Sequence, residues 1–156
     1  MKKPFKVDPS TVRSKEQMRA TEKAAKHGCA WCLPDAIQGS AIIAEFSLVV
    51  VRKNAYPKPG RDMYLIIPKR HIRMQELAPK EMEEIFKARY WLIKELSLRG
   101  GGIIHRFGDR ALNASSLPDD HYFESIVVPH GTEPVAETLF KDRSPEKENA
   151  RKERLK

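Results

Sequence analysis

The sequence predicts an α+β fold in which one long helix packs on a mainly antiparallel sheet and a second helix lies near the N-terminus. Runs of β-branched and aromatic residues at 41–53, 62–69 and 121–129 are typical of strands. Apolar residues recur at helical spacing between 79 and 98. Because strands, one long helix and further strands follow one another without regular βαβ alternation, an antiparallel sheet is favoured over a parallel one.

Length and composition indicate one intracellular domain. At 156 residues, 40% of them hydrophobic, the chain can build one core. No apolar run approaches the roughly 18 residues of a membrane helix, and the start "MKKPFKVDPS" lacks the apolar stretch of a secretory signal. The two cysteines stand three apart in "CAWC", a spacing more typical of metal or redox chemistry than of disulfides. We therefore expect a cytoplasmic protein without a membrane partner.

Two helices are predicted from their formers and stop signals. The segment 11–28 is rich in helix formers, has few apolar positions and closes with Gly28, so it should lie on the surface of the core. The long helix opens at Pro79 and ends before the glycines at 100–102. Its apolar stripe, which should lie across the sheet, consists of Met82, Ile85, Phe86, Leu92, Ile93 and Leu96.

The strand signals place two neighbouring antiparallel strands at 41–53 and 62–69, joined by the proline- and glycine-rich "NAYPKPGR". Pro68 should close the second strand because it has no N–H for the ladder. Further apolar segments follow at 101–109 and 121–129. We divide the chain into a helical extension at 1–27, a domain at 28–140 and a basic, flexible tail at 141–156 that has too few apolar residues to pack.

Four segments stand in an order that resembles the histidine-triad (HIT) family of nucleotide hydrolases and transferases. They are "CAWC" at 29–32, "LIIPKRHI" at 65–72, "LAPKEMEEI" at 77–85 and "IVVP" at 126–129. The likeness spans roughly residues 28–129, and the proline-lysine-histidine segment directly before a helix is its most specific part. The resemblance implies a HIT-like sheet of about five strands, a nucleotide or other phosphorylated small molecule as ligand, and the homodimer that family members often form.

The last strand of the family carries His-x-His-x-His, and this chain keeps only the first histidine. Laid on that pattern, "HYFESIVVP" gives His121, Phe123 and Ser125, which strand alternation places on one face. The second family histidine is the nucleophile that attacks the α-phosphorus, and phenylalanine has no lone pair for this. A slip of one residue would instead present Tyr122, Glu124 and Ile126, without restoring a histidine. Either register indicates a pseudoenzyme.

The resemblance also implies a structural zinc site. Family members with the Cys-x-x-Cys pair bind zinc with it, with the histidine of the "PKRH" segment and with a histidine near the triad strand. The ligands here would be Cys29, Cys32, His71 and His121, a set that suits a closed tetrahedral site. Alternatively, the cysteines are reduced core thiols or a redox pair, and Asp119 or Asp120 could replace His121 by supplying an oxygen.

A phosphate-binding pocket is expected beside this metal site. The resemblance places Asn54 on the ribose, Ser115 and Ser116 on the α-phosphate, and leaves His121 and Ser125 as polar contacts. Arg106 in "RFGD" could add a bidentate charge for phosphate. Each residue also has a plainer interpretation: Asn54 and the two serines as turn residues, and Arg106 as a partner of Asp109.

The leading hypothesis is therefore a catalytically altered HIT-fold protein that binds a nucleotide or another phosphorylated ligand. A second hypothesis is an active hydrolase or nucleotidyltransferase that uses another group as base or nucleophile, for which the candidates are His105, His130, Asp119, Asp120 and Glu124. A third is a nucleic-acid or protein interaction module, since the net charge of +8 favours anionic partners.

Overall fold

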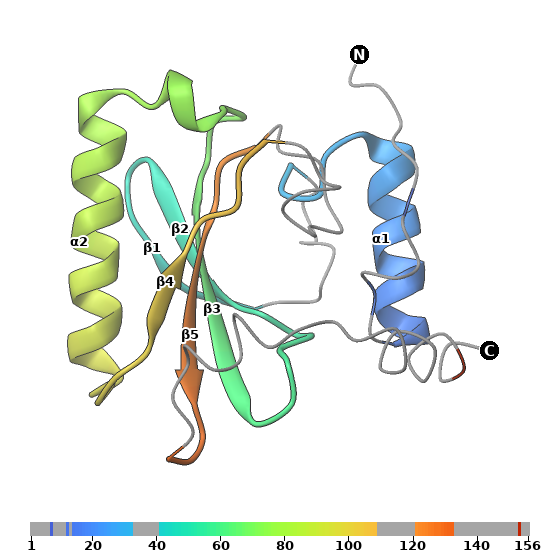
Figure 1. The fold of residues 1–156 in the computed structure, drawn as a ribbon. Helices are drawn as coiled ribbons and strands as arrows, with labels where there is room; N and C mark the ends of the chain where they lie inside the picture. The colour runs from blue at the N-terminus through green and yellow to red at the C-terminus, as the bar shows by residue number, and fades with distance from the viewer. Residues whose placement is uncertain are drawn as a thin grey trace.

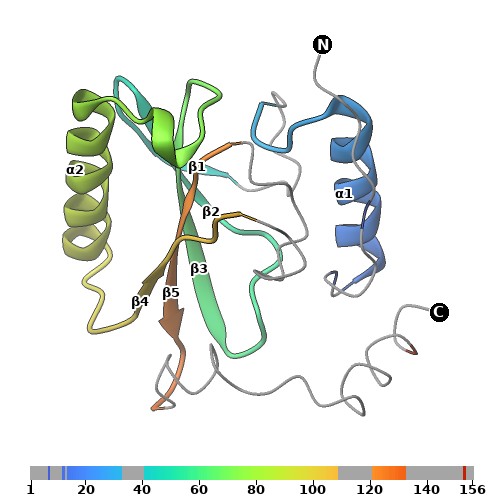
Figure 2. The ribbon, with the colours of Figure 1, turned by 45° about the horizontal axis from the view of Figure 1, so that its top comes forward.

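A computed structural model describes residues 7, 12, 14–32, 41–108, 121–132 and 153. Its centre is a five-stranded sheet in the order β1-β2-β3-β5-β4, in which every neighbouring pair is antiparallel. Helix α2 covers one face, and α1 lies on the opposite side of the sheet (Figures 1 and 2). The predicted fold class is confirmed. The elements are α1 Lys15–His27, β1 Ile42–Glu45, β2 Val49–Lys53, β3 Arg61–Pro68, the 3₁₀ turn η2 Met74–Glu76, α2 Pro79–Glu95, β4 Gly102–Ile104 and β5 Glu124–Pro129.

The first predicted strand is two strands. The chain turns back after Glu45, where Phe46 donates its N–H to the Val49 carbonyl at 2.9 Å, and β1 pairs with β2 as a hairpin. No proline or glycine marks this turn, so composition alone showed one continuous run. A carboxylate of α2 fastens it, because Glu84 Oε2 accepts the Leu48 N–H at 2.6 Å.

The pairing of β2 with β3 and the end of β3 at Pro68 are as predicted. Strand β5 is shorter than expected: it begins at Glu124, and the three residues before it form a lead-in. Tyr122 N–H donates to the Ile72 carbonyl at 2.6 Å, which ties this lead-in to the segment after β3.

Helix α2 buries only two of the six residues of its predicted apolar stripe, Ile85 and Leu92. Ile85, Ala88 and Leu92 are buried in the core cluster, together with side chains of the sheet. The other four residues of the predicted stripe, Met82, Phe86, Ile93 and Leu96, are exposed. The prediction that the whole stripe lies across the sheet is therefore wrong: the sheet contacts one edge of a wide apolar band.

Helix α1 begins at Lys15, four residues later than predicted, because Ser14 caps it by accepting the Gln17 N–H at 3.0 Å. It ends as predicted at Gly28, whose φ of 86° is the left-handed conformation that glycine adopts without strain. Ala24 of this helix clusters with Ala30, and Trp31 packs against the pair.

In the described part of the chain, no helix is both long enough and apolar enough to span a membrane. Several predictions lie outside the described residues: the tail at 141–156 apart from Glu153, the loop serines Ser115 and Ser116, and Asp109, Asp119 and Asp120.

Candidate metal centre and phosphate-binding face

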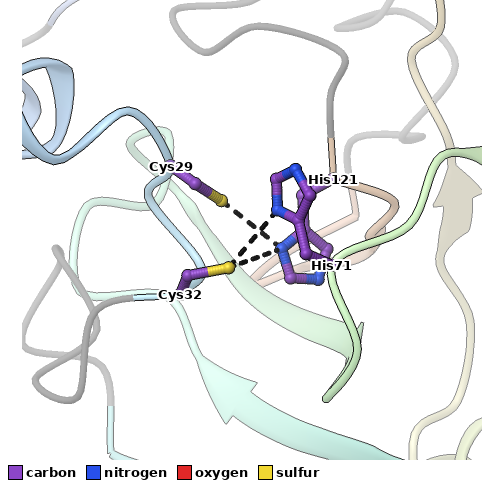
Figure 3. A group of neighbouring side chains, drawn as sticks. All are labelled: Cys29, Cys32, His71 and His121. Carbon is purple, nitrogen blue, oxygen red and sulfur yellow. Dashed lines mark hydrogen bonds between the residues drawn. The ribbon is translucent and has the colours of Figure 1, made fainter. Parts of the chain in front are cut away.

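The four side chains predicted to bind zinc come together. Cys29 and Cys32 follow α1, His71 follows β3, and His121 precedes β5, and their ligand atoms all lie within 4.8 Å of one another. Figure 3 shows the two thiols on one side pointing at the two imidazole rings on the other. Three chain segments that are distant in sequence therefore meet at this cluster.

The distances in the cluster suit one tetrahedral ion. The Sγ atom of Cys32 lies 3.3 Å from His71 Nδ1 and 3.6 Å from His121 Nδ1, and the Sγ atom of Cys29 lies 3.4 Å from His121 Nδ1. Zinc bonds of about 2.3 Å to sulfur and about 2.05 Å to nitrogen separate sulfur and nitrogen ligands by about 3.6 Å. The residues present fit a closed S₂N₂ site.

A carbonyl at the end of β3 orients His121. The Nε2 atom of this imidazole lies 2.9 Å from the Pro68 carbonyl oxygen, so Nε2 carries the proton and donates it. The other ring nitrogen, Nδ1, is then left with a lone pair that faces the two thiols. Both His121 nitrogens are engaged, and the side chain is 1% exposed. The proline that ends β3 thus also fixes the tautomer of a candidate ligand.

Burial raises the pKa of the Cys29 thiol to about 12. A thiol so far from ionisation at neutral pH is a poor redox nucleophile, since the thiolate is the reactive form. A bound cation would reverse this preference by stabilising the thiolate. The environment of Cys29 therefore favours the metal interpretation of "CAWC" over the redox interpretation.

The register of β5 settles which face each side chain of "HYFES" occupies. Glu124 accepts hydrogen bonds from Arg89 of α2, with Arg89 Nε 2.7 Å from Glu124 Oε2, and its flanking residues Tyr122 and Ile126 lie in the core beneath the same helix. Alternation then turns Ser125 to the opposite face. The rival register, with Tyr122, Glu124 and Ile126 toward the pocket, is wrong.

On that opposite face, Phe123 packs against Trp31. The two ring centroids are 4.8 Å apart, and Trp31 comes from between the two cysteines. Ser125 is buried on the same face, opposite Leu65 of β3 and Ile104 of β4. The residue predicted to stand at the position of the family nucleophile is therefore one member of an aromatic pair, beside a buried hydroxyl group.

Other predicted pocket residues lie around this face. Asn54 follows β2 and is buried, and its Oδ1 accepts the Tyr56 N–H at 2.9 Å, as expected of a turn residue. Its Nδ2 amide group and the second lone pair of Oδ1 could still serve a ribose. Arg106 is half-buried two residues after β4, the strand that pairs with β5.

The described candidates for a substitute base are each held by neighbouring groups. His130 approaches Asp62 at 3.4 Å and is exposed, and Glu124 is held by Arg89. His105 Nδ1 donates to the Phe123 carbonyl at 2.9 Å, while its ring packs on Tyr122 with centroids 4.4 Å apart. Each of these groups already serves a structural contact.

Three features were missed by sequence reasoning: the contact of Trp31 with Phe123, the Arg89–Glu124 ion pair under α2, and the buried Arg61 at the start of β3. The sequence did carry a signal for the Trp31 contact. Trp31 stands between the two cysteines of "CAWC", and a residue between two metal ligands must lie close to the metal site. The ion pair joins residues 35 apart and had no local signal.

Comparisons with known proteins agree with this architecture. No family model and no curated protein sequence matches the chain. Among solved structures, a HIT family hydrolase from Clostridium thermocellum is 24% identical, with 72% of this chain and 90% of that chain covered and a TM-score of 0.50. A hypothetical histidine triad nucleotide-binding protein from Sulfolobus tokodaii strain7 is 19% identical, with 80% and 87% covered and a TM-score of 0.50.

At these identities the likeness concerns the fold. This fold is an antiparallel five-stranded sheet with a long helix on one face, and the Cys-Cys-His-His cluster lies where β3 ends and β5 begins. The chain has the fold of the histidine-triad proteins.

Proposed function

We propose that this chain is a HIT-fold protein that binds a nucleotide or another phosphorylated small molecule in a reducing cytoplasm, without nucleotidyl-histidine chemistry. The observation that carries the proposal is Phe123, which stands at the nucleophile position and packs on Trp31. A benzyl ring cannot attack phosphorus. The names of the two structural neighbours, a hydrolase and a nucleotide-binding protein, support phosphate-bearing ligands as the class.

We assign the phosphate contact to Ser125, with Arg106, Ser115 and Ser116 as further donors and the Asn54 amide on the ribose. A hydroxyl group can donate one hydrogen bond to a phosphate oxygen, and a guanidinium can donate two. His121 was a candidate for both phosphate and metal. Because both of its ring nitrogens are engaged, one toward the thiols and one on Pro68, we assign it to the metal.

Zinc is the metal that the donor set fits best, since it accepts thiolate sulfur and neutral imidazole in a tetrahedral site. Cys29, Cys32, His71 and His121 would hold it, and with all four positions filled the ion would cross-link three segments of the fold. It would hold the segment after α1, with Trp31 in it, against the sheet. The basic tail and the helical extension would flank this domain at its two ends.

Titration calorimetry with adenosine 5′-monophosphate tests the function. We expect saturable binding of one ligand per chain that Ser125→Ala weakens about tenfold, the size of one lost hydrogen bond to a charged group. Incubation with nucleoside phosphoramidates and dinucleoside polyphosphates at high protein concentration should give no turnover. Turnover without a covalent adduct would favour the alternative of an enzyme that uses another group.

The exposed half of the α2 apolar band supports a homodimer. Phe86 and Tyr90 are 66% and 68% exposed, and Ile103 of the edge strand β4 is also exposed. An apolar helix face next to an open sheet edge is a surface that a second copy could cover. Sedimentation of the chain and of Phe86→Glu tests this, and a variant with the mass of the unchanged chain would contradict it.

The third candidate, a basic interaction module, rests on the net charge of +8. It predicts binding to single-stranded RNA whose affinity falls steeply with salt, because phosphate contacts release counterions. Mononucleotide binding that changes little with salt favours the pocket instead.

A further inference from the structure

Four buried polar side chains share the sheet face that points away from α2. Every second residue of a strand points to the same face, so Arg61 and Leu65 of β3 share one face. Leu65 is paired with Ser125 of β5, which therefore lies on that face as well. The other two are Asn54, which follows β2, and His121 of the metal cluster. Buried polar groups require hydrogen-bond partners. For one N–H donor of Arg61, the described part of the chain supplies no acceptor.

Arg61 is 6% exposed, and its Nε atom is fully buried without a hydrogen-bond partner in the described part of the chain. The adjacent carboxylate, Asp62, lies on the other face and is held by Lys53 at 3.1 Å and by His130 at 3.4 Å. No carboxylate among the described residues pairs with the Arg61 guanidinium. A buried charge and a buried N–H without acceptors are both unfavourable, so this position calls for an anionic acceptor.

The backbone around Arg61 is fixed rather than loose. Gly60, at a φ of 75°, turns the chain into β3, and its carbonyl accepts the His130 N–H at 2.9 Å. Arg61 itself is paired with Pro129 at the end of β5. The backbone that carries the Arg61 side chain is therefore fixed, at the end of the sheet opposite the metal cluster.

The rows of the sheet give the order of polar groups along this face. Ser125 is level with Leu65, and Asn54 is level with Met63, to whose carbonyl it donates its backbone N–H at 2.8 Å. Arg61 follows two residues further along β3. The backbone positions of Arg61 and Leu65 are about 13 Å apart, four strand residues. Along the face the order is Ser125, then Asn54, then Arg61.

We propose that Arg61 is a second anion subsite of the pocket and that the ligand class is a nucleoside with phosphates on both sides of its ribose. This rests on the proposed function, which places a phosphate at Ser125 and the ribose at Asn54. With those two groups seated, Arg61 lies beyond the ribose, where a guanidinium donates two hydrogen bonds to a phosphate. A nucleoside 3′,5′-bisphosphate has the required order of phosphate, ribose and phosphate.

Calorimetry at constant ionic strength tests this with adenosine 5′-monophosphate and adenosine 3′,5′-bisphosphate. We expect the bisphosphate to bind at least tenfold more tightly to the unmodified chain. Arg61→Gln should remove this difference and leave monophosphate binding within about twofold, as a loss of one charge-assisted contact requires. The control Lys53→Gln removes a positive charge from the opposite face and should preserve the difference. Equal affinities in the unmodified chain, or a difference that survives Arg61→Gln, overturn the proposal.

A second measurement separates the subsite from the proposed function. Arginine Nε–H resonances are followed by nuclear magnetic resonance during titration with inorganic phosphate, with the Arg61 signal assigned by its loss in Arg61→Lys. A saturable shift of this signal supports the subsite even if adenosine 5′-monophosphate fails to bind, in which case only the proposed function falls. The opposite result is that the monophosphate binds, the Arg61 signal does not shift with phosphate, and the bisphosphate binds no more tightly. That result would support the proposed function and contradict the subsite.

Discussion

Trp31 and Phe123 lie in contact, with their ring centroids 4.8 Å apart and their planes inclined at 49°. One ring belongs to the loop that carries both cysteines, and the other belongs to the residue that the sequence resemblance predicts at the nucleophile position. Trp31 also packs against the small apolar cluster of Ala24 from α1 and Ala30. The indole therefore links the N-terminal helix, the candidate metal cluster and the sheet face of Phe123, and we expect a change at one of them to affect the others.

This contact predicts that restoring histidines alone will not restore chemistry. In Phe123→His with Ser125→His, the new imidazole would lie against the Trp31 ring, with little room for a phosphate group. Adding Trp31→Ala should open that space and raise kcat/KM for a nucleoside phosphoramidate at least tenfold above the double variant. Zinc content and circular dichroism of both variants serve as controls. A double variant as active as the triple variant would mean that Trp31 does not obstruct the site.

Zinc should bind with one ion per chain and with release of protons. Because the pKa of Cys29 is raised to about 12 by burial, its thiol is protonated at pH 7.5 and must lose that proton to bind the metal. We expect at least one proton released per zinc, measured by calorimetry in buffers of different ionisation enthalpy. Zinc affinity should therefore increase with pH.

The same site predicts a stability change on metal removal. At a free zinc concentration about 1,000 times the Kd, binding adds about 4 kcal/mol to the free energy of unfolding, which chelation would remove. Cys29→Ser should abolish stoichiometric zinc and make the melting temperature insensitive to chelator. A chain that melts at one temperature with and without chelator contradicts a structural zinc.

Arg89 and Glu124 form a mostly buried ion pair between α2 and β5, and Tyr122 donates its hydroxyl proton to the same carboxylate. Arg89→Ala would leave the Glu124 charge buried without its partner, so the free energy of unfolding should fall by roughly 3 kcal/mol. Chemical denaturation measures this. The matched control, Lys87→Ala, breaks an exposed pair with Glu83 on the same helix and should cost less than about 0.5 kcal/mol. Equal losses of unfolding free energy in the two variants would show that the buried pair stabilises the fold no more than the exposed pair does.

The sequence predicted what depends on local pattern and on the spacing of chemical groups. Helix α1 ends at Gly28, helix α2 starts at Pro79 and strand β3 ends at Pro68. These boundaries follow from the backbone properties of glycine and proline, so they could be predicted without a structure. The set Cys29, Cys32, His71 and His121 was predicted from the resemblance, and the geometry brings it together.

What could not be predicted depends on packing between distant segments. The turn at Phe46 carries no glycine or proline, and it forms because α2 offers Glu84 to the Leu48 N–H. The exposure of Phe86 depends on how α2 rolls on the sheet, which its apolar spacing leaves undetermined. The burial of Arg61 requires the register between β3 and β5, which appears only after the sheet has formed.

Glu81 should make the start of α2 sensitive to acid. Its carboxylate accepts hydrogen bonds from Arg70 at 2.9 and 3.0 Å and from the Ala78 N–H at 2.9 Å, and the Arg70 hydrogen bonds lower the pKa of Glu81. A carboxyl group with a lowered pKa in the folded state stabilises the fold above its unfolded pKa, and this contribution is lost as pH falls through the folded pKa.

The difference in unfolding free energy between the chain and Glu81→Gln isolates this contribution. At pH 7 the variant should be less stable by about 1 kcal/mol, the usual size of a helix-capping contact, because the amide keeps an acceptor for Ala78 but loses the charge that faces Arg70. Below about pH 4 the two proteins should converge, because protonation removes the same charge from Glu81. Glu83→Gln, which alters an exposed carboxylate two residues further along the helix, is the control and should show a far smaller difference. A Glu81→Gln deficit that stays constant from pH 7 to pH 3 would assign the effect to packing of the side chain instead of to its charge.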